Sequence, residues 1–94
     1  MGREFLEFVD VKSIKVDLAA VSLVPAVVAF KYNILPISLE RKEAPGELTL
    51  ALADIYTSLA AVDNIRLATR CRINLVQGNA DDIWDALARI YPEH

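Results

Sequence analysis

The stretch from Val24 to Leu39, VPAVVAFKYNILPISL, limits the folds open to this chain more than any other part of it. Pro25 suits the first turn of a helix, because the N–H that proline lacks would have no partner there. The residues that follow, as far as about Tyr32, are apolar on nearly every side of that helix. A helix of this kind needs cover on more than one side. We therefore expect it to lie between a sheet and either the N-terminal arm of the chain or another protein.

A strand follows this helix without a linker. Asn33 is typical of a residue that ends a helix in the left-handed conformation, and the segment 34–39 has the residues of a strand. Pro36 restricts that strand to the edge of a sheet or to a bulge, since proline has no N–H for a ladder. The polar segment 40–46 ends in Pro-Gly, a pair that suits a type II turn. The alternating leucines of 48–53 predict a second strand, so we expect the two strands to pair as a hairpin.

The segments on either side of this unit are less regular. Residues 5–14 fit neither a helical nor a strand period, which indicates an extended arm with a short strand. Asp17 can cap a short helix that ends near Ser22. After the second strand, the segment 58–69 predicts a helix. Its expected inner residues are Leu59, Val62, Ile65 and either Leu67 or Ala68.

The last third of the chain predicts one more strand and one more helix. Residues 71–76 alternate as a strand does, Gly78 breaks the chain, and Asn79 is a good N-cap for a final helix. Because a helix separates the second strand from the third, we expect a right-handed parallel crossover between them. The apolar stripe of the final helix consists of Ile83, Trp84, Leu87, Ile90 and Tyr91.

Together these elements predict one α/β (α+β) domain. Its small three-stranded mixed sheet, a hairpin plus a parallel crossover strand, packs with three to four helices. The 94 residues suffice for one modest core and are too few for two domains. We expect residues 1–16 to form an N-terminal arm and residues 17–92 to form the domain, and we interpret residues 93–94 as a possible tag remnant.

Composition and charge argue against several classes of protein. The net charge is −3 and the basic residues are scattered, whereas a nucleic-acid-binding face needs them concentrated. The most apolar run, 18–30, is shorter than the roughly 20 residues that cross a bilayer, so we expect no membrane span. One cysteine and no secretory signal pattern favour the cytoplasm. Apolar residues make up 54% of the chain, which favours an apolar surface offered to a partner.

The sequence has no recognisable catalytic, cofactor-binding or metal-binding motif. A phosphate-binding loop needs several glycines followed by a lysine and a hydroxyl residue, and the three glycines here lie far apart. The single histidine is the terminal residue, so Cys71 has no base in reach and is better explained as a small buried residue. Asp81, Asp82 and Asp85 are better explained by the dipole of a helix start than by a bound cation.

Four segments, kept in order, carry a resemblance to a known family. They are 24–37, 48–54, 63–69 and 82–91. Over roughly 8–91 the chain resembles the N-terminal domain of the ATPases that drive bacterial type II secretion and type IV pilus assembly. It departs from the usual pattern of that family by having Ile55 in place of proline, Arg70 in place of glycine, and a longer hairpin loop.

The resemblance implies a docking and regulatory module and not an enzyme, with the nucleotide chemistry in another domain of the ATPase. The implied partner is the cytoplasmic domain of an inner-membrane secretion or pilus assembly protein, together with the rest of the ATPase if this chain is a fragment. The implied location is the cytoplasm, with attachment to the inner membrane only through that partner. We expect no nucleic acid and no cofactor among its ligands.

Two groups of side chains are candidates for partner binding. An apolar patch on the helix that starts at Pro25, or an open sheet edge, would carry the contact, with charged residues at its rim. Three arginines crowd the end of one helix and the next strand, where compensation of the helix dipole competes with a site for an anion or an acidic partner. The candidate residues are Val27, Val28, Lys31, Arg66, Arg70 and Arg72.

A cyclic-di-GMP-sensing module is the alternative function. Some members of the family bind cyclic di-GMP and carry paired Arg-Leu-Gly elements, and this chain has no such element. The resemblance therefore assigns no ligand residue, and in this alternative Arg66, Arg70 and Arg72 would meet the phosphates. An enzyme is the third hypothesis and ranks last, because no acid, base and nucleophile can be assembled from the residues present.

Overall fold

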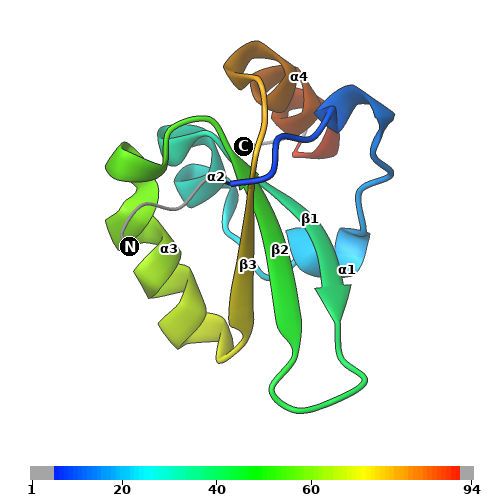
Figure 1. The fold of residues 1–94 in the computed structure, drawn as a ribbon, viewed down its shortest axis with the longest axis vertical. Helices are drawn as coiled ribbons and strands as arrows, with labels where there is room; N and C mark the ends of the chain where they lie inside the picture. Colours follow the sequence, from blue (N-terminus) through cyan, green and yellow to red (C-terminus); the bar gives the residue numbers. More distant parts are fainter. Residues whose placement is uncertain (1–5, 92–94) are drawn as a thin grey trace.

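A computed structural model of the protein describes residues 6–91, shown in Figure 1. The first five residues of the expected arm and the expected tag remnant lie outside these described residues. The elements are η1 (Val11–Ser13), α1 (Leu18–Val21), α2 (Ala26–Tyr32), β1 (Ile34–Glu40), β2 (Glu47–Leu52), α3 (Ile55–Thr69), β3 (Arg72–Gln77) and α4 (Ala80–Ile90). In Figure 1 the strands run through the centre, α4 lies across one end of the sheet, and the loop between β1 and β2 extends from the other end.

The sheet has the order β1-β2-β3, with β2 in the middle. β1 pairs with β2 antiparallel and β3 pairs with β2 in parallel, so the predicted hairpin plus parallel strand is confirmed. Both expectations for Pro36 hold, because β1 is an edge strand and its register shifts between Pro36 and Ser38. The predicted α+β fold is therefore confirmed.

Short polar side chains begin the helices, as expected. The backbone N–H of Ala19 donates to Asp17 at 2.9 Å, and that of Asp82 donates to Asn79 at 3.0 Å. Asn33 ends α2 in the left-handed conformation, with φ of 56° and ψ of 51°. The direct passage from α2 into β1 therefore depends on a residue type that tolerates this conformation.

The start and the inner face of α3 differ from the prediction. The helix begins at Ile55 and not at residue 58, because Asp54 accepts a hydrogen bond from the backbone N–H of Tyr56 at 3.0 Å. Leu59, predicted on the inner side, is 51% exposed. Of the alternatives Leu67 and Ala68, the first is 66% exposed and the second is exposed as well. The buried residues of the helix are Ser58, Ala61, Val62 and Ile65.

The hydroxyl of Ser58 explains this rotation of α3. It donates within the helix to the carbonyl oxygen of Asp54, 2.9 Å away, and it lies 3.4 Å from the carbonyl oxygen of Tyr32 at the end of α2. A buried hydroxyl is stable only when it is hydrogen-bonded in this way. Periodicity of apolar residues cannot reveal such a position.

The hairpin loop also differs from the prediction. A type II turn needs a positive φ at its glycine, and no glycine of the described residues has one. Gly46 serves a different purpose, since a Cβ there would lie 2.9 Å from the carbonyl oxygen of Glu40. The predicted type II turn is therefore wrong, because the loop is wider than a tight turn and the glycine permits a close backbone approach.

The N-terminal arm pairs with the end of β3. The backbone N–H of Val9 donates to the carbonyl oxygen of Gln77, and the N–H of Gln77 donates to that of Glu7, each at 2.8 Å. The predicted short strand is a single parallel bridge between Phe8 and Gln77. Val11 of η1 is buried, so the arm contributes to the core.

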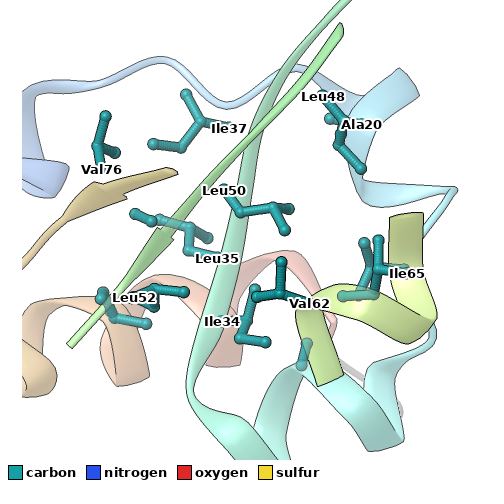
Figure 2. Packing of buried hydrophobic residues seen from close by; sticks show 14 of the residues in the cluster. Ala20, Ile34, Leu35, Ile37, Leu48, Leu50, Leu52, Val62, Ile65 and Val76 are labelled. Carbon is teal, nitrogen blue, oxygen red and sulfur yellow. The ribbon is translucent and has the colours of Figure 1, made fainter. Parts of the chain in front are cut away.

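β2 forms the centre of the core. Its alternating leucines, Leu48, Leu50 and Leu52, are fully buried on one face of the sheet, and Ala51 is fully buried on the other. Figure 2 shows these leucines among the buried residues that β1, α1 and α3 contribute. The strand is thus enclosed from both sides, and its side chains hold the helices to the sheet.

An aromatic cluster joins α4 to the helices before β1. The ring of Phe30 lies edge-on to those of Trp84 and Tyr91, with centroids 5.0 and 6.0 Å apart. The Tyr91 hydroxyl lies 2.8 Å from the carbonyl oxygen of Val24 and 3.2 Å from that of Val21. Burial raises the pKa of Tyr91 from 10.0 to about 12.

Replacement of Leu50 by Ala is expected to lower the free energy of unfolding by about 2–5 kcal/mol, because it leaves a cavity beside the central strand. The matched control is Leu67→Ala, the same change at an exposed position, which should stay within about 0.5 kcal/mol. Urea unfolding measures both. Equal effects of the two substitutions would contradict the assignment of β2 as the centre of the core.

Tyr91→Phe is expected to lower stability at neutral pH by about 1 kcal/mol, because it removes the hydroxyl that donates to the α1–α2 turn. The higher pKa in the folded state means that folding favours the protonated hydroxyl. This stabilisation is complete below pH 10 and declines as the pH rises towards 12. Between about pH 8 and about pH 11, the free energy of unfolding measured in urea should therefore fall more for the original chain than for Tyr91→Phe. Parallel losses would refute the role of the hydroxyl.

Candidate functional site

An open apolar groove of about 340 Å³ lies between α2 and α3. Three of the predicted partner-binding residues, Val27, Val28 and Lys31, line it. The other residues that line it are Leu23, Pro25, Tyr32, Ala61, Asn64, Ile65 and Ala68. The groove therefore has one wall from α2 and the turn before it, and a second wall from α3.

α2 can form a wall of the groove because it has more apolar residues than the core of the domain covers. Ala29 is buried inside the domain, and Val28 and Phe30 are half-buried on either side of it. Val27 is left 76% exposed. The prediction that this helix needs cover on more than one side is consistent with this placement, because the described residues cover its inner side and leave Val27 in solvent.

The wall formed by α3 is the edge of its core-facing side, because Ala61 and Ile65 are buried there while Asn64 and Ala68 are exposed. Ala61, Asn64, Ile65 and Ala68 follow the i, i+3, i+4, i+7 spacing of one helical stripe. Sequence reasoning missed this wall. The available signal was the small size of Ala61 and Ala68 next to apolar residues on other sides of the same helix.

Among the described residues that line the groove, Lys31 alone is charged. Its Nζ lies 5.5 Å from the centroid of the Tyr32 ring, and the salt bridges found among residues 6–91 do not involve it. The charge is therefore available to a molecule that enters the groove.

The apolar surface continues from α2 towards α4. Trp84 is 49% exposed and meets the edge of Phe30. The sequence predicts Trp84 on the apolar stripe of the final helix, and the structure leaves it half-exposed beside α2. Tryptophan is enriched at the centres of interfaces, so this position suits contact with a partner.

A second hollow, of about 400 Å³, lies at the other end of α3. The three predicted arginines line it, together with Pro45, Leu67 and Cys71. Arg66 is engaged with Asp63, whose Oδ1 lies 2.9 Å from its Nη2. Arg70 ends the helix in the left-handed conformation with φ of 61°. None of the residues 6–91 lines both hollows, so the predicted residues lie in two separate hollows.

Three further features of the described residues concern metal binding, Cys71 and membrane spans. Residues 6–91 hold no group of three or more histidine, cysteine or acidic side chains that could bind a metal ion. Cys71 is buried, as predicted, and its thiol lies 3.7 Å from the carbonyl oxygen of Thr69. Over the same residues, none of the helices combines the length and the apolar character that a bilayer crossing needs.

Comparison with known proteins identifies the class. The chain belongs to the MshEN domain family, whose model matches residues 5–94. The predicted resemblance to the N-terminal domain of type II secretion and type IV pilus ATPases is thereby confirmed. No curated protein matches the sequence.

Solved structures share the fold. A structure of MshE with cdg superposes with a TM-score of 0.73 at 23% identity, over 92% of this chain and 59% of that chain. Two crystal forms of the N-terminal domain of XpsE superpose with TM-scores of 0.67 and 0.70, at 26% and 27% identity, each over 89% of this chain and 56% of that chain. The chain thus spans less than two thirds of the length of these solved chains.

Proposed function

We propose that this chain is a non-catalytic docking and regulatory domain of a type II secretion or type IV pilus ATPase. It binds the cytoplasmic domain of an inner-membrane assembly protein through the groove between α2 and α3. The nucleotide chemistry of the ATPase then belongs to another domain. Membership of the MshEN family supports the assignment to such an ATPase, and the exposed apolar groove supports the mode of binding.

The exposure of Val27 is the observation that carries this proposal. A valine in the middle of an apolar helix gains about 1.5 kcal/mol or more when it is fully buried. Val27 is instead 76% exposed, beside the groove and close in sequence to Phe30, which packs on the half-exposed Trp84. Interfaces combine such an apolar centre with a polar rim, and Lys31 and Asn64 supply polar groups here.

Val27→Glu is expected to weaken binding of the partner's cytoplasmic domain at least about tenfold, because it places a charge in the centre of the contact. Tyr56→Glu is the matched control. Tyr56 is also a large exposed residue, at 83%, but it lies outside the groove. Biolayer interferometry measures both affinities, and circular dichroism checks that each variant folds. If Val27→Glu folds and binds as tightly as the original chain, the groove is not the docking site.

Cyclic-di-GMP sensing is the second candidate, and the hollow lined by Arg66, Arg70 and Arg72 is the observation that favours it. Arginine forks suit phosphate oxygens, and a structural relative is described with cdg. The absence of an Arg-Leu-Gly element weighs against it. The two candidates use different surfaces and can therefore be separated.

Calorimetry with cyclic di-GMP is expected to give no heat of binding. A measurable heat of binding would instead favour ligand sensing. It would assign the ligand to the arginine hollow if Arg70→Ala abolished the heat and Val27→Glu left it unchanged. Arg70→Gly is the matched control for the left-handed backbone at this position, because glycine removes the guanidinium and adopts a positive φ without strain.

A further inference from the structure

We infer that the groove between α2 and α3 receives an amphipathic helix of the partner, with a carboxylate placed against Lys31. The inference rests on the proposed function and specifies the chemistry of the partner segment. Three observations support it, namely the type of backbone that forms the walls, the dimensions of the groove, and its single charge.

The walls exclude an extended segment. Apart from the turn that carries Leu23 and Pro25, the walls are α-helices, whose backbone N–H and C=O groups in the middle of the helix are paired internally. An extended peptide binds by adding its backbone to an open sheet edge, and this groove presents no such edge. A strand laid here would leave its own polar backbone groups against apolar side chains, at a cost of about 1–3 kcal/mol for each buried group. A helix satisfies its own backbone and has no such cost.

The dimensions suit about two turns of helix. α2 has 7 residues, which corresponds to a length of roughly 10 Å. Ala61 and Ala68 stand one heptad apart on the opposite wall, and their small side chains let another helix come close. A partner helix would then place apolar residues at i, i+3 or i+4, and i+7 against Val27, Val28 and Ile65.

The charge of Lys31 favours an acidic residue beside the apolar stripe of the partner helix. Lys31 is the only charged residue that lines the groove, and no ion pair holds it among the described residues. A partner helix with a glutamate or aspartate beside its apolar stripe gains a charge-assisted hydrogen bond there, whereas a lysine at that place is repelled. The net charge of the whole chain is −3, so at long range the chain repels an acidic partner helix, in contrast to the attraction by Lys31 at short range.

Synthetic helical peptides test this chemistry directly. Four peptides of about 18 residues share a leucine stripe at the i, i+3, i+7 spacing. Two differ only at the flanking positions, which hold Glu or Lys. A third has Gln there, and a fourth carries a central proline that breaks the helix. Titration into the isotopically labelled chain, followed by NMR, gives the affinity and the binding surface together.

The Glu peptide should shift the amide signals of Val27, Ile65 and Ala68 and bind about fivefold more tightly than the Lys peptide. The Gln peptide should fall between them, and the proline peptide should not bind. Lys31→Glu should reverse the order of the Glu and Lys peptides. Lys42→Glu is the matched control, because it makes the same change of net charge in the hairpin loop and should leave the order unchanged.

Equal affinity for the Glu and Lys peptides, shifts confined to other surfaces, or binding of the proline peptide would each overturn the inference. Failure of the proposed function looks different. In that case, the peptides show the expected order while the cytoplasmic domain of the inner-membrane protein does not bind. Conversely, capture of that domain together with equal peptide affinities would leave the proposed function standing without this inference.

Discussion

The burial of β2 on both of its faces is the constraint on which the rest of the structure depends. Its leucines need one apolar layer and Ala51 needs another, so helices and the N-terminal arm must pack on both sides of a sheet of only three strands. Few residues are available for these layers. α2 keeps apolar side chains towards solvent beyond those that it gives to the core, and α3 contributes the edge of its core-facing side, where the buried Ala61 and Ile65 meet the exposed Ala68. The groove between them is a direct consequence of covering a small sheet with short helices.

That origin also bears on the proposed docking function. The residues that line the groove come from two helices that the core already holds in place, so little conformational entropy remains to be lost when a partner binds. Lys31 adds a charge to a surface that is otherwise apolar. The arginine hollow lies at the far end of α3, and its charges are partly used to offset the helix dipole and to pair with Asp63. The two hollows are thus separate features of the described surface.

Features set by neighbouring residues could be predicted from the sequence. Asn33 in the left-handed conformation, Pro36 at an edge with a bulge, and the caps at Asp17 and Asn79 all follow from local backbone chemistry. The inner face of α3 could not be predicted from apolar periodicity, because it includes the hydroxyl of Ser58, which donates to Asp54 within the helix and is buried close to Tyr32 at the end of α2. For the same reason the α2 wall of the groove was found and the α3 wall was missed, since only the tertiary fold brings the two helices together.

Hydrogen exchange of the chain, alone and mixed with the cytoplasmic domain of the proposed inner-membrane partner, distinguishes docking in the groove from binding at another surface. Exchange reports protection segment by segment, and the amides of a docking surface become slower on binding. Docking in the groove between α2 and α3 predicts new protection in α2 and in the part of α3 from Ala61 to Ala68, with no change of exchange around Arg70 to Arg72. Protection at the arginine hollow or along β3, with α2 unchanged, would contradict it.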